Sequence, residues 1–195
     1  MSIHMHQGTG GCQCVARSTP CSQNLDEMDF TRGIWSAAMN GEVEQVQKHL
    51  DKNCPDVLDS SGYTALHYAA RHGHLNVCKI LLICGANPNC LTPAGKASPL
   101  HRAAYSGHSD IVEILAKHGA KLDSIDVDGQ TALHKAAQKS HTEVIQVLMK
   151  ENPSLSSIRD KWHKQPVDYV AKTNKELQIL LKPIMEFENM EVTKS

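Results

Sequence analysis

A short segment recurs three times in this chain at a period of 33 or 34 residues, and this repetition constrains the fold more than any other feature. The copies, which share the pattern Leu-His-x-Ala-Ala, lie at residues 59–74, 95–108 and 126–141. The middle copy is longer by one residue, which the glycine spacing places between Gly95 and Leu100. A period of roughly 20 to 50 residues is typical of solenoids, in which each unit packs only against its neighbours. We therefore expect an elongated stack of small units.

Each copy predicts a helix with defined ends. Hydroxyl side chains that can cap a helix precede the Leu-His step at Thr64, Ser98 and Thr131. The leucine and the two alanines then form an apolar stripe at helical spacing, and a second helical pattern follows. Between the two patterns stand Gly73 and Gly107, at sites that favour a left-handed backbone. The third copy has Ser140 there, so we expect a left-handed serine that costs roughly 1 kcal/mol relative to glycine.

The pattern G-x-T-P-L-H-x-A-A-x-x-G-H at this period resembles the ankyrin repeat. Weaker copies flank the three, with Trp35 and Asp168 in the place of the histidine, and such departures are typical of terminal repeats. The resemblance implies an all-α ankyrin-repeat solenoid of about five helix-turn-helix repeats within residues 25–182. Their expected bounds are near residues 30–58, 59–91, 92–125, 126–158 and 159–182. It also implies an intracellular protein without a catalytic domain.

The two ends of the chain differ from the repeats in composition. Residues 1–24 are rich in Cys, Gly, Ser, Thr and Gln and almost free of large aliphatic side chains, which predicts a disordered N-terminal tail. Residues 183–195 predict a flexible C-terminal tail. The start of the chain lacks the apolar stretch of a secretory signal, and no aliphatic run approaches the roughly 20 residues that cross a bilayer. With an odd number of cysteines, seven, we expect reduced thiols in the cytoplasm, the nucleus or both, and no contact with a membrane.

Histidine is abundant, at 12 of 195 residues, but the sequence assigns most of it a structural role. Six histidines occupy two repeat positions: His67, His101 and His134, and then His74, His108 and His141. Copies one repeat apart lie roughly 10 Å from each other, too far to share an ion with bonds near 2.0 Å. The chain also lacks the nucleophile and phosphate-binding motifs of the common enzyme classes. We therefore expect no enzyme, no cofactor and no catalytic residue.

An alternative of a different class rests on the N-terminal cysteines, Cys12, Cys14 and Cys21. Thiolates are soft ligands, so this cluster could serve a metal- or redox-responsive protein in which the repeats act as a scaffold. Zinc sites, however, commonly use a C-x2-4-C spacing, whereas a single residue separates Cys12 from Cys14 and no second pair completes four thiolates. An unstructured tail with exposed thiols is the favoured interpretation.

The remaining functional signal lies on the surface. In an ankyrin stack the loop tips and the exposed side of each first helix form a concave face that usually binds protein. By register, this face carries eight basic residues and one acid, Asp128, although the net charge of the chain is −1. The basic residues are Arg71, Lys96, Arg102, Lys135, Lys139, Lys161, Lys164 and Lys172. The alternative is a solvated face that is basic without function.

These observations predict a non-enzymatic adaptor that binds a partner protein, with an acidic segment, through the basic concave face. Aromatic side chains would anchor the partner and the cations would steer it. The predicted partner-binding residues are Tyr63, Tyr68, Arg71, His72, Lys96, Arg102, Tyr105, Lys135, Lys139 and Trp162. Nucleic acid is a disfavoured partner because few aromatics interleave the cations and the net charge is −1. We expect a monomer.

Overall fold

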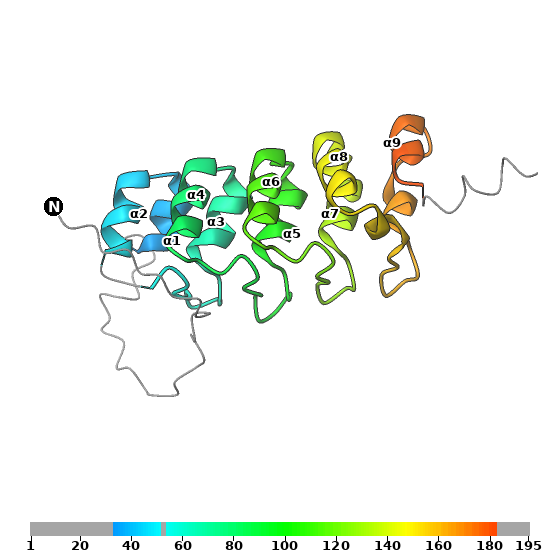
Figure 1. Ribbon diagram of the computed structural model, residues 1–195. Helices are drawn as coiled ribbons and strands as arrows, with labels where there is room; N and C mark the ends of the chain where they lie inside the picture. Colours follow the sequence, from blue (N-terminus) through cyan, green and yellow to red (C-terminus); the bar gives the residue numbers. More distant parts are fainter. Residues whose placement is uncertain (1–32, 52–53, 183–195) are drawn as a thin grey trace, which may run out of the picture.

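The computed structural model describes residues 33–51 and 54–182, which form an elongated row of short helices with no strand among these residues (Figure 1). The all-α repeat solenoid predicted from the sequence is confirmed. The predicted tails, residues 1–24 and 183–195, lie outside the described residues, and so do Cys12, Cys14 and Cys21.

Four helix pairs, each joined by a tight turn, form most of the row. They are α1 (Ile34–Asn40) with α2 (Val43–Leu50), α3 (Ala65–His72) with α4 (Leu75–Ile83), α5 (Pro99–Ser106) with α6 (Ser109–Lys117), and α7 (Ala132–Lys139) with α8 (Thr142–Glu151). The first helices α1, α3, α5 and α7 pack side by side in one layer, and α2, α4, α6 and α8 form the other. This layering aligns equivalent residues of successive repeats along one face.

The fifth unit departs from the predicted helix-turn-helix form. After the 3₁₀ helix η3 (Pro153–Ser157), its first helix is a single 3₁₀ turn, η4 (Pro166–Tyr169), followed by α9 (Lys175–Leu180). The backbone of Val170 is extended where the other repeats continue their helix with alanine. A β-branched residue loses side-chain freedom in a helix, and its bulk prevents the close approach that alanine allows.

The core is continuous along the row because small and large apolar side chains alternate between its layers. Alanine pairs such as Ala103–Ala104 are fully buried between neighbouring first helices, where bulkier side chains would hold the helices apart. Leu81, Leu115 and Leu148 are fully buried at equivalent places in the second layer. Truncating one of these leucines to alanine typically costs about 2–5 kcal/mol.

One histidine of each regular repeat bonds to the next repeat. The backbone N of Thr64 donates to Nδ1 of His67 at 3.2 Å, so Nε2 carries the proton and donates to the carbonyl oxygen of Ala97 at 3.1 Å. The same geometry joins His101 to the carbonyl of Gln130 and His134 to that of Lys164. In the first repeat, Trp35 replaces the histidine and its indole N–H donates to the carbonyl of Val57 at 3.0 Å.

The second histidine of each regular repeat bonds to the preceding repeat. Its ring lies against the turn of that repeat, where a residue without a side chain is therefore required. Nε2 of His141 lies 3.1 Å from the carbonyl oxygen of Tyr105, and its ring covers Gly107, whose φ is 87°. A Cβ atom on Gly107 would come within 2.7 Å of this ring. Ser140 is left-handed, with φ 57°, as predicted. It avoids the clash because Asn174, rather than a histidine, stands in the next repeat and caps α9 there.

A loop that we call a finger precedes each first helix. The fingers are residues 59–63, 92–97, 126–130 and 160–164. In each finger, the residue that stands two positions before the helix cap has a left-handed backbone. These residues are Gly62, Gly129 and His163, and in the third repeat Lys96, with φ 47°. The extra residue of the third repeat therefore precedes Lys96. The prediction that it lies between Gly95 and Leu100 is wrong, because the left-handed position is set by the cap and not by the glycine.

Candidate functional site: a pocket between two fingers

A depression of about 390 Å³ lies between fingers 92–97 and 126–130, and we call it the finger pocket. Its walls include Tyr63, Ala94, Gly95, His101, Arg102, Tyr105, Asp126, Val127, Asp128 and Lys135. Backbone bonds hold the fingers in place, because Val127 N donates to the Gly95 carbonyl at 3.0 Å and Lys161 N donates to the Asp128 carbonyl at 3.1 Å. Four of the predicted partner-binding residues, Tyr63, Arg102, Tyr105 and Lys135, meet in this pocket.

An aspartate organises three of the four fingers. Asp126 Oδ1 accepts hydrogen bonds from the backbone N–H groups of Asp128 and Gln130, both at 2.9 Å. Asp59 and Asp160 do the same in their own fingers. Finger 92–97 has Thr92 instead, whose hydroxyl accepts from the backbone N of Ala97 at 3.1 Å.

The second oxygen of each aspartate bonds to one side chain on the following helix. Tyr68 donates to Asp59 at 2.7 Å, Lys135 donates to Asp126 at 2.6 Å, and Tyr169 donates to Asp160. The structurally equivalent residue of the third repeat is Arg102, because each of these four residues stands one position after the histidine or its substitute. Thr92 offers no carboxylate to Arg102.

Arg102 is therefore held by a tyrosine. Its Nη2 donates to the Tyr63 hydroxyl at 2.7 Å, and its Cζ lies 5.2 Å from the centroid of the Tyr63 ring. Its Nε is buried and has no hydrogen-bond acceptor within the described part of the chain. The guanidinium group thus retains donors without partners at the wall of the finger pocket.

Lys135 belongs to an internal network that joins the fourth and fifth repeats. Besides Asp126, it donates to the Gln130 side-chain oxygen at 2.8 Å. The Gln130 side-chain nitrogen donates in turn to Tyr169 at 2.9 Å and to Asp160 at 3.2 Å. Burial acts to raise the pKa of Asp126, but Lys135 and the backbone amides outweigh it and lower this pKa. Lys135 is thus less available to a partner than the sequence suggested.

Other predicted residues are exposed around the pocket. Lys139 extends over Tyr105, with Nζ 4.7 Å from the ring centroid, and Tyr105 is 45% exposed. Arg71 and His72 are exposed at the end of α3, and Tyr68 packs against Tyr63 with 5.6 Å between ring centroids. The structure thus brings Tyr63, Tyr68, Arg102, Tyr105 and Lys139 into one cluster.

Two further predicted residues lie on the fingers and do not line the finger pocket. Trp162 is 58% exposed on finger 160–164, and Lys96 is exposed on finger 92–97, and neither lines the finger pocket. The site also includes residues that the sequence did not single out, namely Thr92, Asp126, Asp160 and Tyr169. A signal for them existed, because an aspartate recurs at the repeat spacing, at residues 59, 126 and 160, and is replaced by threonine in one repeat.

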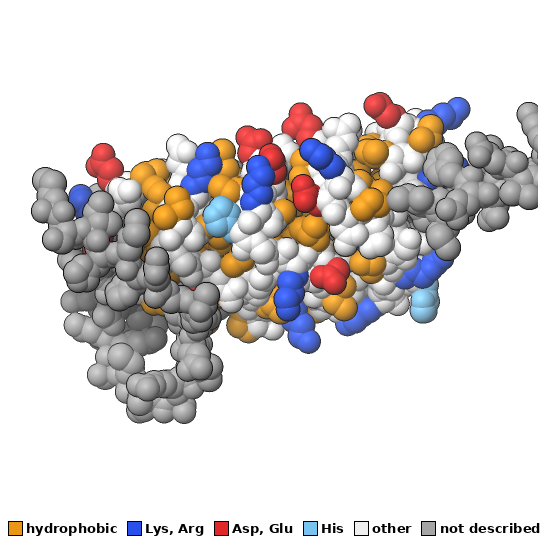
Figure 2. All heavy atoms as spheres, in the orientation of Figure 1, with side chains coloured by type: hydrophobic (Ala, Val, Ile, Leu, Met, Phe, Trp, Pro, Cys, Tyr) orange, Lys and Arg blue, Asp and Glu red, His pale blue; other side chains and the backbone are white. Residues whose placement is uncertain are grey.

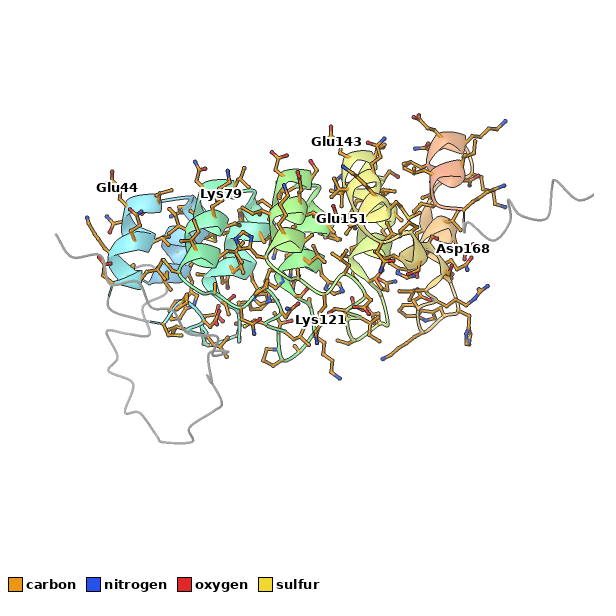
Figure 3. The ribbon with its side chains drawn as sticks, viewed as in Figure 1. Glu44, Lys79, Lys121, Glu143, Glu151 and Asp168 are labelled. Atoms are coloured by element: carbon orange, nitrogen blue, oxygen red, sulfur yellow. The ribbon has the colours of Figure 1, made fainter. Side chains whose placement is uncertain are left out.

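The acids of the second-helix layer lie away from the fingers. Figure 2 shows acidic side chains along the upper rim of the stack, opposite the edge that carries the fingers. Glu44 at the start of α2 and Glu143 at the start of α8 point outward there, where negative charge is favourable at a helix N-terminus (Figure 3). Lys121 lies toward the opposite edge.

Within residues 33–51 and 54–182, no group of three His, Cys, Asp or Glu side chains is arranged to hold a metal ion. Cys78 lies in the core, and burial raises the pKa of its thiol to about 12, which keeps it protonated at neutral pH. Of the helices described, none combines the length and apolar character that a bilayer span requires.

Comparison with known proteins agrees with this architecture. A family model described as "Ankyrin repeats (3 copies)" matches overlapping segments at residues 12–92, 34–126, 81–161 and 100–189. The chain is 56% identical to ankyrin repeat domain-containing protein 39 of Homo sapiens over 72 residues, which are 36% of this chain and 39% of that protein. The Bos taurus protein of the same name is 52% identical over 64 residues, 32% of this chain and 35% of that protein. The chain thus aligns with less than half of the length of these two relatives.

A further relative is covered more fully. Cyclin-dependent kinase 4 inhibitor B of Mus musculus is 35% identical over 99 residues, which are 50% of this chain and 75% of that protein.

Proposed function

Because this chain belongs to the ankyrin repeat family, we propose that its stack of protein-interaction repeats is a non-enzymatic adaptor that binds a partner through the basic concave face. The observation that carries the proposal is the finger pocket and its surroundings, where tyrosines and unneutralised cations meet. Tyrosine and arginine are the residue types that most often dominate binding energy in protein interfaces.

Charge supports an acidic partner segment. Arg71, Lys96 and Lys139 are exposed on this face and form no ion pair within the described residues. Two of the aspartates that could offset them, Asp126 and Asp160, are buried in internal hydrogen bonds. The relatives support the binding of a partner protein, since one of them is named as an inhibitor of another protein, a kinase.

The experiment begins with the partner. Cross-linking and mass spectrometry from cells would name the proteins in contact with the chain, and the affinity of a purified partner would then be measured at several salt concentrations. The test variant is Arg71→Glu with Lys139→Glu, because both side chains are exposed and outside the core. We expect about tenfold weaker binding with a smaller dependence on salt.

A matched control carries the same change of charge on the other layer. Lys79→Glu with Lys150→Glu places it on α4 and α8, at exposed positions in the layer of second helices. The control variant should bind like the natural chain. Equal weakening by both variants, or by neither, contradicts the concave-face proposal.

The proposal includes a monomer in the cytoplasm or the nucleus and leaves nucleic acid as a disfavoured partner. Sedimentation and imaging of the tagged chain in cells test the first two points. The metal- or redox-responsive alternative rests on Cys12, Cys14 and Cys21, and elemental analysis of chain purified without a His tag tests it. Substoichiometric zinc and copper, with all thiols free, would leave that alternative without support.

A further inference from the structure

We propose that Arg102 is a receptor for one carboxylate of the partner, an Asp or Glu side chain that enters the finger pocket. This inference deepens the proposed function and rests on it. It starts from a comparison of the four equivalent residues Tyr68, Arg102, Lys135 and Tyr169. Three of them donate to the aspartate of their own finger, and Arg102 alone among these four has threonine there.

The third repeat thus has a side-chain donor, Arg102, but lacks the aspartate that accepts from this position in the other repeats. An arginine carries five N–H donors, and the only side-chain acceptor bonded to Arg102 within the described residues is the Tyr63 hydroxyl. The Nε–H is buried without an acceptor there, although a buried polar group without a hydrogen bond is costly. A carboxylate that enters the pocket can bond to two N–H groups at the terminal nitrogens together, in the two-pronged geometry that makes arginine–carboxylate pairs strong.

The surroundings of Arg102 favour this ligand. Tyr63 and Tyr105 line the pocket together with Arg102. Lys139 lies over Tyr105 and adds positive charge at the rim. The neighbouring Asp126 is already neutralised by Lys135 at 2.6 Å, so it does not satisfy Arg102.

One group in the pocket opposes an incoming anion. Asp128 is half-buried, lines the same depression and forms no ion pair within the described residues. Its carboxylate repels a second one, which predicts that Asp128→Asn strengthens the binding of an acidic ligand. This opposite response separates a carboxylate receptor from a merely structural role of the pocket.

The test uses the full chain and two capped peptides, a hexaglutamate and a hexaglutamine. The Nε–Hε signal of Arg102 is followed by nuclear magnetic resonance and assigned by its loss in Arg102→Gln. We expect the glutamate peptide to shift this signal in a saturable way and the glutamine peptide to leave it unchanged. Arg102→Gln should weaken binding of the glutamate peptide about tenfold, and Asp128→Asn should strengthen it about threefold.

A second pair of variants restores the missing aspartate. Thr92→Asp offers Arg102 an internal carboxylate, and Thr92→Asn is its neutral match of the same size. We expect Thr92→Asp to bind the glutamate peptide about tenfold more weakly than Thr92→Asn does. If either threonine variant does not fold, Arg102→Gln and the Arg102 signal still decide the question.

Several results would overturn the inference. They are an Arg102 signal that the glutamate peptide does not move, an equal shift with glutamine, or a larger shift with inorganic phosphate at the same concentration. Partner binding that is lost in Arg71→Glu with Lys139→Glu but unchanged in Arg102→Gln would refute the receptor and leave the concave-face proposal standing.

Discussion

At the scale of single residues, the histidines determine how neighbouring repeats are joined. His67, His101 and His134 bond forward to the next repeat, while His74, His108 and His141 bond backward to the preceding one. The forward set is buried, and desolvation lowers the pKa of each imidazole, in His67 to about 4. These rings are neutral in the folded chain and hold one tautomer.

The lowered pKa of His67 predicts loss of stability in mild acid. The unfolded chain takes up a proton near pH 6.5, which the folded chain resists down to pH about 4, so the free energy of unfolding falls as the pH drops through this window. His67 alone accounts for a loss of about 3 kcal/mol at the lower end. Urea unfolding at a series of pH values measures it, and His67→Asn should show a smaller loss than the natural chain. Equal losses in both chains would contradict this assignment.

Replacing Ser140 by glycine should stabilise the folded chain. Because its backbone is left-handed and no imidazole covers it, Ser140→Gly should raise the free energy of unfolding by up to about 1 kcal/mol. The reverse change at the equivalent site, Gly107→Ser, should cost more, since its side chain would also meet the His141 ring. In a His141→Asn background this extra cost should disappear. A lower melting temperature for Ser140→Gly would mean that the left-handed serine is not strained.

At the scale of elements, the fifth repeat is the least regular part of the described chain. Its first helix is reduced to the single turn η4, and Asp168 in the place of the histidine accepts from the backbone N of Gln165 at 2.8 Å rather than donating to a further repeat. The network of Gln130, Asp160 and Tyr169 joins it to α7. This network adds a polar connection to the packing between η4 and α7.

Removing one hydroxyl should loosen this end selectively. Tyr169→Phe takes away a donor to Asp160 and leaves the pocket residues in place. Amide hydrogen exchange should then quicken in η4 and α9 and remain unchanged in α3 to α6, because repeats interact only with their neighbours. Tyr63→Phe, which removes a tyrosine hydroxyl in the second repeat, is the control and should leave α9 unaffected. Uniform quickening along the stack would contradict this local effect.

At the scale of the whole molecule, each repeat packs only against its neighbours along the stack, and the candidate site lies in the middle repeats rather than at an end. The finger pocket uses residues of the second, third and fourth repeats, so flanking repeats support it from both sides. Its position predicts that binding survives the loss of the terminal unit while stability does not.

A chain ended at Glu151 tests this independence. This change removes η3 together with the fifth unit and exposes core residues such as Leu148. It should lower the free energy of unfolding and its dependence on urea, since less surface is buried. Affinity for the hexaglutamate peptide should stay within about twofold of the natural value at a temperature where both chains are folded, because the bond from Val127 N to the Gly95 carbonyl still holds finger 126–130 after the Lys161 bond is lost. A loss of affinity larger than that would place part of the site in the fifth repeat.

The sequence by itself determined the repeat, its period, the helix caps and the left-handed Ser140, because these depend on contacts within a few residues. It also assigned Tyr63, Arg102, Tyr105 and Lys135 to one face, since equivalent positions of a solenoid share an orientation. Spacing along the chain does not say which groups already satisfy each other. Only the tertiary structure decided that Lys135 is bonded to Asp126 while Arg102, at the same place one repeat earlier, has no carboxylate partner among the described residues. That difference arises from contacts between a finger and the following helix, together with the fingers on either side, and it requires the distances that folding creates.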